Sequence, residues 1–94
     1  MNNDEFRRAG YRIIDWIADY RANVETRPVM AQTAPGEIKA RLPKSPPAAP
    51  ESIDDIVSDL DRVVLPGITT WQHPRFFGYF PSNALFASLL GDWR

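Results

Sequence analysis

The interpretation of this sequence starts from Trp71-Gln72-His73-Pro74-Arg75-Phe76-Phe77-Gly78-Tyr79-Phe80-Pro81. Five of its eleven residues are aromatic, and two are proline. Proline lacks a backbone N–H and fixes φ, so a looped or extended path is predicted for residues 66–81. The aromatic side chains could line an apolar slot, in which each ring pair adds about 0.5–1.5 kcal/mol beyond area burial. An ordinary packed core is the alternative interpretation of the same cluster.

The titratable residues do not form a recognisable catalytic group. His73 is the only histidine, and we interpret it as a hydrogen-bonding structural residue. With one histidine and no cysteine, no metal site is predicted. Lys39 and Lys44 are the only lysines, and their proline-rich surroundings lack the desolvation that a Schiff-base lysine needs. The residues therefore predict no catalytic, cofactor-binding or metal-binding group in this segment.

A helix over about residues 52–65 is predicted immediately upstream of the aromatic stretch. Ser52 and Asp55 form a capping pair, and Pro66-Gly67 is expected to end the helix. Its apolar stripe consists of Ile53, Ile56, Val57, Leu60, Val63 and Val64.

Residues 28–50 contain six prolines and few large apolar side chains, so they are interpreted as a connector. Within it, Glu37 to Leu42 could form one or two helical turns before Pro43. The pattern Lys44-x-x-Pro47-x-x-Pro50 also resembles ligands of proline-binding domains.

An amphipathic helix is predicted over about residues 3–26. Asn2 and Glu5 form a capping pair, and Pro28 is expected to stop the helix. Ile14 and Trp16 widen the apolar face, which could pack within its own domain or on a second subunit. The stripe consists of Phe6, Ala9, Ile13, Ile17, Tyr20 and Val24.

A third helix is predicted from about residue 82, with Ser82 or Asn83 as its cap. Its apolar residues spread around the helix, which requires burial on all sides. Because the rest of the chain cannot supply that burial and no C-terminal cap follows, we expect an unfinished helix in the N-terminal piece of a longer protein. A small domain with this helix as its core is the alternative. The sequence thus predicts an all-α segment of three helices and a proline-rich connector.

Composition limits the partners and the location. The 94 residues suffice for one small domain, and 11 basic residues balance 12 acidic ones. This balance argues against nucleic-acid binding by phosphate neutralisation and against a polybasic membrane segment. There is no apolar run long enough to cross a membrane. The polar N-terminus and the absence of cysteine favour a cytoplasmic location.

The whole chain resembles the N-terminal segment of the pyridoxal-phosphate-dependent aromatic-L-amino-acid decarboxylases (group II decarboxylases). The aromatic stretch is the most specific part of the resemblance. The other matching parts are Glu5-Phe6-Arg7-Arg8, Asp15 to Tyr20, Arg27-Pro28-Val29, Pro35-Gly36, Leu42-Pro43, Pro50-Glu51, Pro66-Gly67 and Ser88 to Asp92.

The resemblance implies an enzyme of PLP fold type I, a homodimer with intertwined N-terminal helices and a large α/β cofactor domain absent from this chain. It implies decarboxylation of aromatic L-amino acids to aryl amines and CO2 by the complete protein, with pyridoxal 5'-phosphate bound outside this segment. By itself this segment is expected to be inactive. Substrate contacts are implied for the residues matching Trp71, Tyr79, Phe80, Pro81 and Ser82. Many family members carry Thr where this chain has Ser82, and Ala where it has Gly78.

A second hypothesis comes from the residues alone. The chain could be a free-standing helical dimer that acts as an interaction module through its proline-rich connector.

Overall fold

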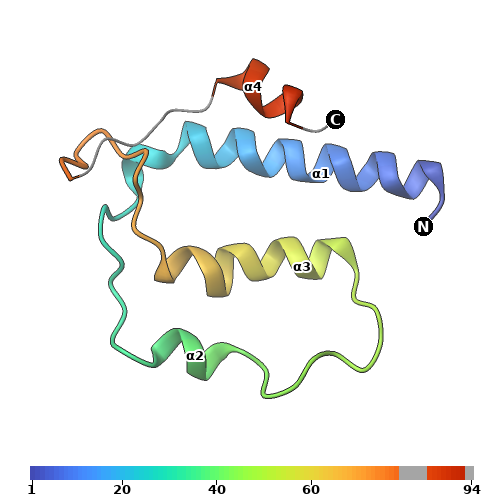
Figure 1. The fold of residues 1–94 in the computed structure, drawn as a ribbon, viewed down its shortest axis with the longest axis horizontal. Helices are drawn as coiled ribbons and strands as arrows, with labels where there is room; N and C mark the ends of the chain where they lie inside the picture. The colour runs from blue at the N-terminus through green and yellow to red at the C-terminus, as the bar shows by residue number, and fades with distance from the viewer. Residues whose placement is uncertain (79–84, 93–94) are drawn as a thin grey trace.

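The computed structural model describes residues 1–78 and 85–92. The molecule is flat, measuring 43 × 37 × 21 Å along its principal axes. In Figure 1 the long helix α1 (Asn3–Ala22) lies between α3 (Ile53–Asp59) on one side and α4 (Phe86–Gly91) on the other. The short helix α2 (Glu37–Arg41) lies beyond α3. The described residues form helices, turns and loops and no strand, which confirms the all-α prediction for this segment.

Helix α1 begins where the capping pair predicts. The Asn2 side chain accepts a 2.9 Å hydrogen bond from the Glu5 N–H, and the Glu5 carboxylate accepts a 2.8 Å bond from the Asn2 N–H. The helix ends at Ala22, earlier than the expected residue 26. The side-chain amide of Asn23 donates to the carbonyl of Asp19 at 2.9 Å, the same carbonyl that accepts from the Asn23 backbone N–H, and such a bond favours the end of a helix. A 3-10 turn, η1 (Val24–Thr26), follows.

The second predicted helix runs further than expected and changes its pitch. Ser52 accepts a 3.1 Å hydrogen bond from the Asp55 N–H and caps α3. The chain then continues as a π-helical stretch, η2 (Leu60–Val64), and a 3-10 turn, η3 (Leu65–Gly67). Pro66 therefore lies inside the helical run, which ends at Gly67.

The distortion has a local cause. Pro66 has no N–H to donate to the carbonyl of Arg62, four residues earlier. That carbonyl instead accepts a 3.3 Å hydrogen bond from Arg41 at the end of α2. A hydrogen-bond donor from α2 thus replaces the N–H that proline lacks.

Helix α2 corresponds to the helical turns that Glu37 to Leu42 could form within the connector. Gly36 precedes it with φ of 83°, a left-handed conformation that suits glycine. Glu37 accepts from the Ala34 N–H at 2.9 Å and pairs with Arg41 at 2.9 Å. Residues 42–50, which follow α2, are exposed throughout.

Helix α4 starts later than the expected residue 82. Leu85 is extended, and its carbonyl accepts hydrogen bonds from the Leu89 N–H at 3.1 Å and the Ser88 hydroxyl at 2.7 Å. The helix therefore begins at Phe86. The predicted caps Ser82 and Asn83 lie outside the described residues.

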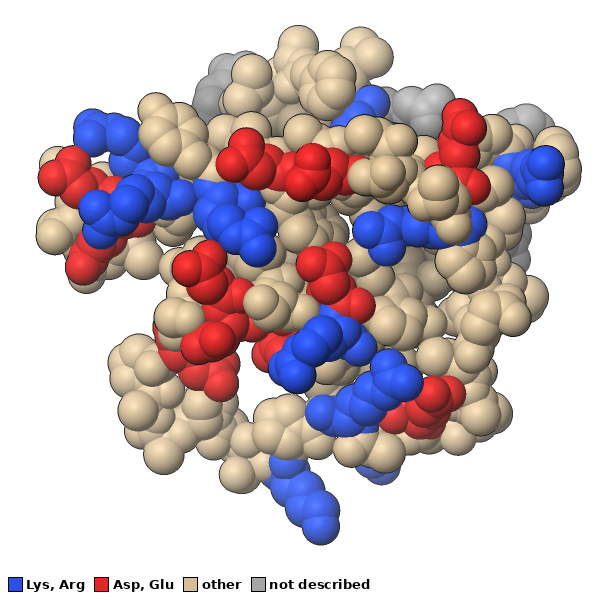
Figure 2. All heavy atoms as spheres, turned by 180° about the vertical axis from the view of Figure 1, so that it is seen from behind, with Lys and Arg blue, Asp and Glu red and all other residues tan. Residues whose placement is uncertain are grey.

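The described core is very small. Val57 on α3 is the only apolar side chain among the described residues that is fully buried, at 2% exposure. Large apolar side chains remain exposed on α1 (Phe6 and Tyr11) and at α4 (Leu85, Phe86 and Leu90). Figure 2 shows acidic and basic side chains interspersed over the opposite face, without a large area of one sign.

Candidate functional site

The aromatic loop (residues 66–81, described up to Gly78) is hydrogen-bonded to the segment that follows α1. Thr70 is 5% exposed and donates twice to that segment. Its N–H bonds to the carbonyl of Val29 at 2.7 Å, and its hydroxyl bonds to the carbonyl of Pro28 at 2.9 Å. Two stretches about forty residues apart in the sequence are thus held side by side.

His73 makes a third connection and is 8% exposed. Its Nδ1 accepts a 3.0 Å hydrogen bond from the Arg75 N–H, and its Nε2 lies 3.2 Å from the carbonyl of Glu25. A backbone N–H can only donate and a carbonyl can only accept, so Nδ1 is unprotonated and Nε2 carries the proton. The contacts of both ring nitrogens agree with the interpretation of His73 as a hydrogen-bonding residue.

The described part of the loop, up to Gly78, presents one stacked ring pair. Trp71 and Phe76 lie with their centroids 5.6 Å apart and their planes inclined by 14°. Trp71 is 43% exposed, whereas Phe77 is 89% exposed and does not form a wall with them. Of the predicted substrate-binding residues, Trp71 lies in the described part of the chain, and Tyr79, Phe80, Pro81 and Ser82 lie outside it.

A second ring pair lies on α1 and contacts the loop through Tyr20. Trp16 stacks on Tyr20 at 5.7 Å, and the guanidinium of Arg27 lies 5.0 Å from the Tyr20 ring centroid. The indole N–H of Trp16 donates to Asp61 on η2 at 3.1 Å. The Tyr20 hydroxyl lies 3.5 Å from the side-chain oxygen of Gln72, at the limit of a hydrogen bond. Side chains on one face of α1 thus contact both η2 and the aromatic loop.

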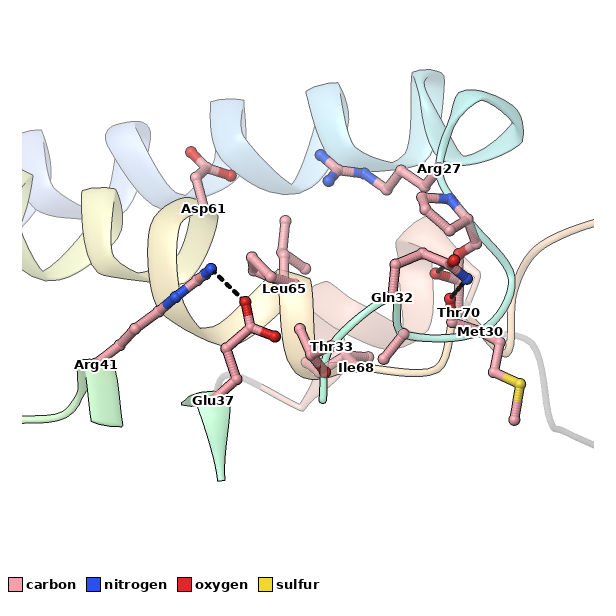
Figure 3. Close-up of a pocket in the computed structure, with 13 residues that line it drawn as sticks. Arg27, Met30, Gln32, Thr33, Glu37, Arg41, Asp61, Leu65, Ile68 and Thr70 are labelled. Atoms are coloured by element: carbon pink, nitrogen blue, oxygen red, sulfur yellow. Dashed lines mark hydrogen bonds and ion pairs between the residues drawn. The ribbon is translucent and has the colours of Figure 1, made fainter. Parts of the chain in front are cut away.

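A pocket of about 330 Å³ opens between the 27–33 segment, α2 and η3. Figure 3 shows Arg27 and Asp61 on one side of it and the Arg41–Glu37 ion pair on another. Arg27 Nε is buried without a hydrogen-bond partner. The lining carries both signs of charge and belongs to the same junction that holds Thr70.

Among the described residues there is neither a lysine in the surroundings of a Schiff-base lysine nor a metal-binding cluster. Lys39 on α2 and Lys44 in the connector are both exposed, so neither offers the desolvated amine that an imine with the cofactor needs. Within residues 1–78 and 85–92, no group of three or more His, Asp or Glu side chains could hold a metal. In the same residues no helix is long and apolar enough to span a bilayer.

Sequence reasoning missed several residues that build this junction. Thr70 carried no recognisable signal, because its partners are backbone carbonyls about forty residues away. Arg27 carried none either, because its partner, the Tyr20 ring, lies across the end of α1 and not within one helical turn. The Glu37–Arg41 pair was detectable, since opposite charges four residues apart stabilise a helix.

Comparisons with known proteins place the chain in a family. Residues 35–94 match the pyridoxal-dependent decarboxylase conserved domain, so the chain belongs to the pyridoxal-dependent decarboxylase family. It is 50% identical over 92 residues to a tyrosine decarboxylase of Papaver somniferum. It is 42% identical over 92 residues to an aromatic-L-amino-acid decarboxylase of Catharanthus roseus. Each match covers 98% of this chain and 18% of the relative, so the chain spans less than a fifth of these proteins.

Solved structures match the fold over the same extent. The tryptophan decarboxylase of Catharanthus roseus, in complex with L-tryptophan, matches with a TM-score of 0.90 and 40% identity. The 4-hydroxyphenylacetaldehyde synthase of Rhodiola rosea matches with a TM-score of 0.92 and 36% identity. Both matches cover 99% of this chain and 20% of the other. The chain therefore corresponds to one part of a larger family fold.

Proposed function

We propose that this chain is the substrate-pocket and dimerisation segment of a pyridoxal-phosphate-dependent decarboxylase that converts aromatic L-amino acids to aryl amines and CO2. The observation that carries the proposal is the 42–50% identity, over 98% of the chain, to tyrosine and aromatic-L-amino-acid decarboxylases. When bound, the cofactor supplies the electron sink for the pair left by the departing CO2. The residues that hold it are assigned to the remainder of the protein.

The role proposed for the aromatic loop is to grip the ring of the substrate. Trp71, with its flat contact to Phe76, offers an exposed aromatic surface on a loop that Thr70 and His73 fasten firmly. Tyr79, Phe80, Pro81 and Ser82 are proposed to complete the pocket. Fixing the ring restricts the orientation of the amino acid, and this is binding energy used for positioning.

The role proposed for the exposed helical surfaces is dimerisation. Phe6 and Tyr11 on α1 are 70% and 63% exposed, and Phe86 and Leu90 on α4 are 63% and 64% exposed. Full burial of such side chains contributes roughly 1.5–3 kcal/mol each. A partner subunit that covers them would explain why so apolar a surface is retained. We further propose that the dimer is cytoplasmic.

A specific observation favours a second candidate reaction. The aldehyde synthase matches this chain as well as the decarboxylases do, with a TM-score of 0.92. Under this second proposal the complete protein would convert the amino acid, O2 and water to an aryl acetaldehyde, CO2, ammonia and hydrogen peroxide, instead of an amine and CO2. The backbone of this segment is compatible with either outcome.

The test uses the complete protein encoded by the gene. Purified protein is incubated with L-tyrosine or L-tryptophan and pyridoxal phosphate, and the products are identified by mass spectrometry. An amine with released CO2 supports the leading proposal, and an aldehyde supports the second. Turnover of neither substrate, by protein that displays a bound-cofactor absorbance band, would refute both. A protein with no such band that is captured by proline-binding domains would favour the interaction-module hypothesis.

A further inference from the structure

The backbone of His73 takes part in two turns of the aromatic loop. Its N–H donates to the carbonyl of Thr70 at 3.2 Å, and its carbonyl accepts from the Phe76 N–H at 3.0 Å. Two successive turns therefore meet at this residue. A displacement of His73 is transmitted through one turn to Phe76, whose ring stacks on Trp71.

The two ring nitrogens of His73 have separable tasks. The bond from the Arg75 N–H to Nδ1 is local and shapes the turn. The bond from Nε2–H to the Glu25 carbonyl spans 48 residues and ties the loop to η1 at the end of α1. Of these two bonds, only the second joins the loop to another element, and it adds to the two bonds that Thr70 makes to Pro28 and Val29.

Both nitrogens are engaged in a site that is 8% exposed, so neither is available to exchange a proton with a substrate. A base at this position would have to break one of the two bonds first. The two bonds of the imidazole hold in place the turn that carries the Trp71–Phe76 ring pair.

We propose that His73 is a positioning residue for the aromatic substrate. Its neutral imidazole holds the loop to the Glu25 carbonyl and thereby sets the position of the Trp71–Phe76 pair. This inference rests on the proposed function, because it assigns the ring pair a substrate to orient.

Two matched substitutions separate the two bonds. In His73→Asn, the side-chain oxygen replaces Nδ1 and can still accept from the Arg75 N–H, but the side chain is too short to reach Glu25. In His73→Gln, the side-chain amide replaces Nε2 and can still donate to the Glu25 carbonyl. Both residues are polar and uncharged, so the pair differs mainly in reach.

In the complete protein loaded with cofactor, we expect His73→Asn to raise KM for L-tyrosine or L-tryptophan by about two- to tenfold, the effect of one net hydrogen bond. We expect kcat to change by less than about twofold, and His73→Gln to restore KM to nearly the wild-type value. The cofactor absorbance band should be the same in all three proteins. Equal KM values for both variants and wild type would overturn the proposal, as would a defect of equal size in both variants.

Hydrogen exchange provides a readout that does not need activity. Backbone amides of residues 70–76 should exchange faster in His73→Asn than in His73→Gln, because only the former releases the loop from Glu25. If wild-type protein turns over no aromatic amino acid, the proposed function fails and the substrate-positioning role fails with it. Faster exchange in His73→Asn would then still support the claim that the His73–Glu25 bond holds the loop. Identical exchange in both variants would overturn that claim as well.

Discussion

Replacing Gly78 by alanine should disturb the ring pair that the aromatic loop presents. A Cβ atom at this position would lie 2.7 Å from Cζ of Phe76, whereas ordinary contact begins at 3.4 Å. The edge of the Phe76 ring must therefore retreat by about 0.7 Å, the difference between these two distances. Phe76 stacks on Trp71 at 5.6 Å, so the retreat changes the surface offered to a substrate.

The size of the effect follows from the stacking energy. An aromatic pair contributes about 0.5–1.5 kcal/mol beyond area burial, and this sets the upper limit of what the added methyl group can remove. Such an energy corresponds to roughly two- to tenfold in an equilibrium constant. We expect Gly78→Ala to change the ratio of kcat/KM for L-tryptophan and L-tyrosine by this factor in the complete protein. Because family members carry alanine here, according to the resemblance, the change should affect selectivity and not folding.

Two controls isolate the contact. Gly10→Ala on α1 adds the same methyl group where nothing lies within 4 Å, and the selectivity ratio should stay unchanged. Phe76→Leu removes the three ring atoms that the new Cβ would meet, so Gly78→Ala should have little further effect in that background. An effect of equal size in both backgrounds would refute the reasoning, as would a selectivity ratio unchanged by Gly78→Ala.

Two further predictions concern the packing that supports the loop. Gly67→Ala would place a Cβ 2.8 Å from Cγ1 of Ile38 on α2. The overpacking should destabilise α2 by about 1–1.5 kcal/mol. Tryptic cleavage after Arg41 should then become roughly tenfold faster. Cleavage after the exposed Lys44 should not change, and Ile38→Ala should abolish the effect; cleavage after Arg41 at the wild-type rate would contradict the prediction. Trp16→Phe removes the 3.1 Å bond to Asp61 and should destabilise the α1–η2 contact by about 1 kcal/mol, measured by hydrogen exchange of α1 amides. Combining it with Asp61→Ala should add nothing more, and full additivity of the two substitutions would count against a direct bond.

The starts of α1 and α3 were predictable because their signals are local. Asn2 with Glu5, and Ser52 with Asp55, satisfy free N–H groups within one helical turn, and each pair forms in the structure. The helix ends were harder to predict. Asn23 ended α1 early, and Pro66 was absorbed into the helical run because Arg41 from another element satisfies the Arg62 carbonyl.

The anchors of the aromatic loop could not be predicted from the sequence. Thr70 and His73 donate to the carbonyls of Pro28, Val29 and Glu25. Every residue carries such a carbonyl, so the acceptor side of these bonds has no sequence signature. That His73 would form hydrogen bonds was predictable from its surroundings, but the Glu25 carbonyl as its partner was not.

The comparisons indicate that binding of the substrate and the identity of the product depend on different features. Backbones that match this segment with TM-scores of 0.90 and 0.92 occur in a tryptophan decarboxylase and in a 4-hydroxyphenylacetaldehyde synthase. A feature shared by two such proteins cannot by itself determine whether an amine or an aldehyde forms. What the two names have in common is an aromatic compound, and the loop described here offers an aromatic surface on a rigid support. Substitutions at His73 and Gly78 should therefore change which ring is bound and how tightly, while the identity of the product stays the same.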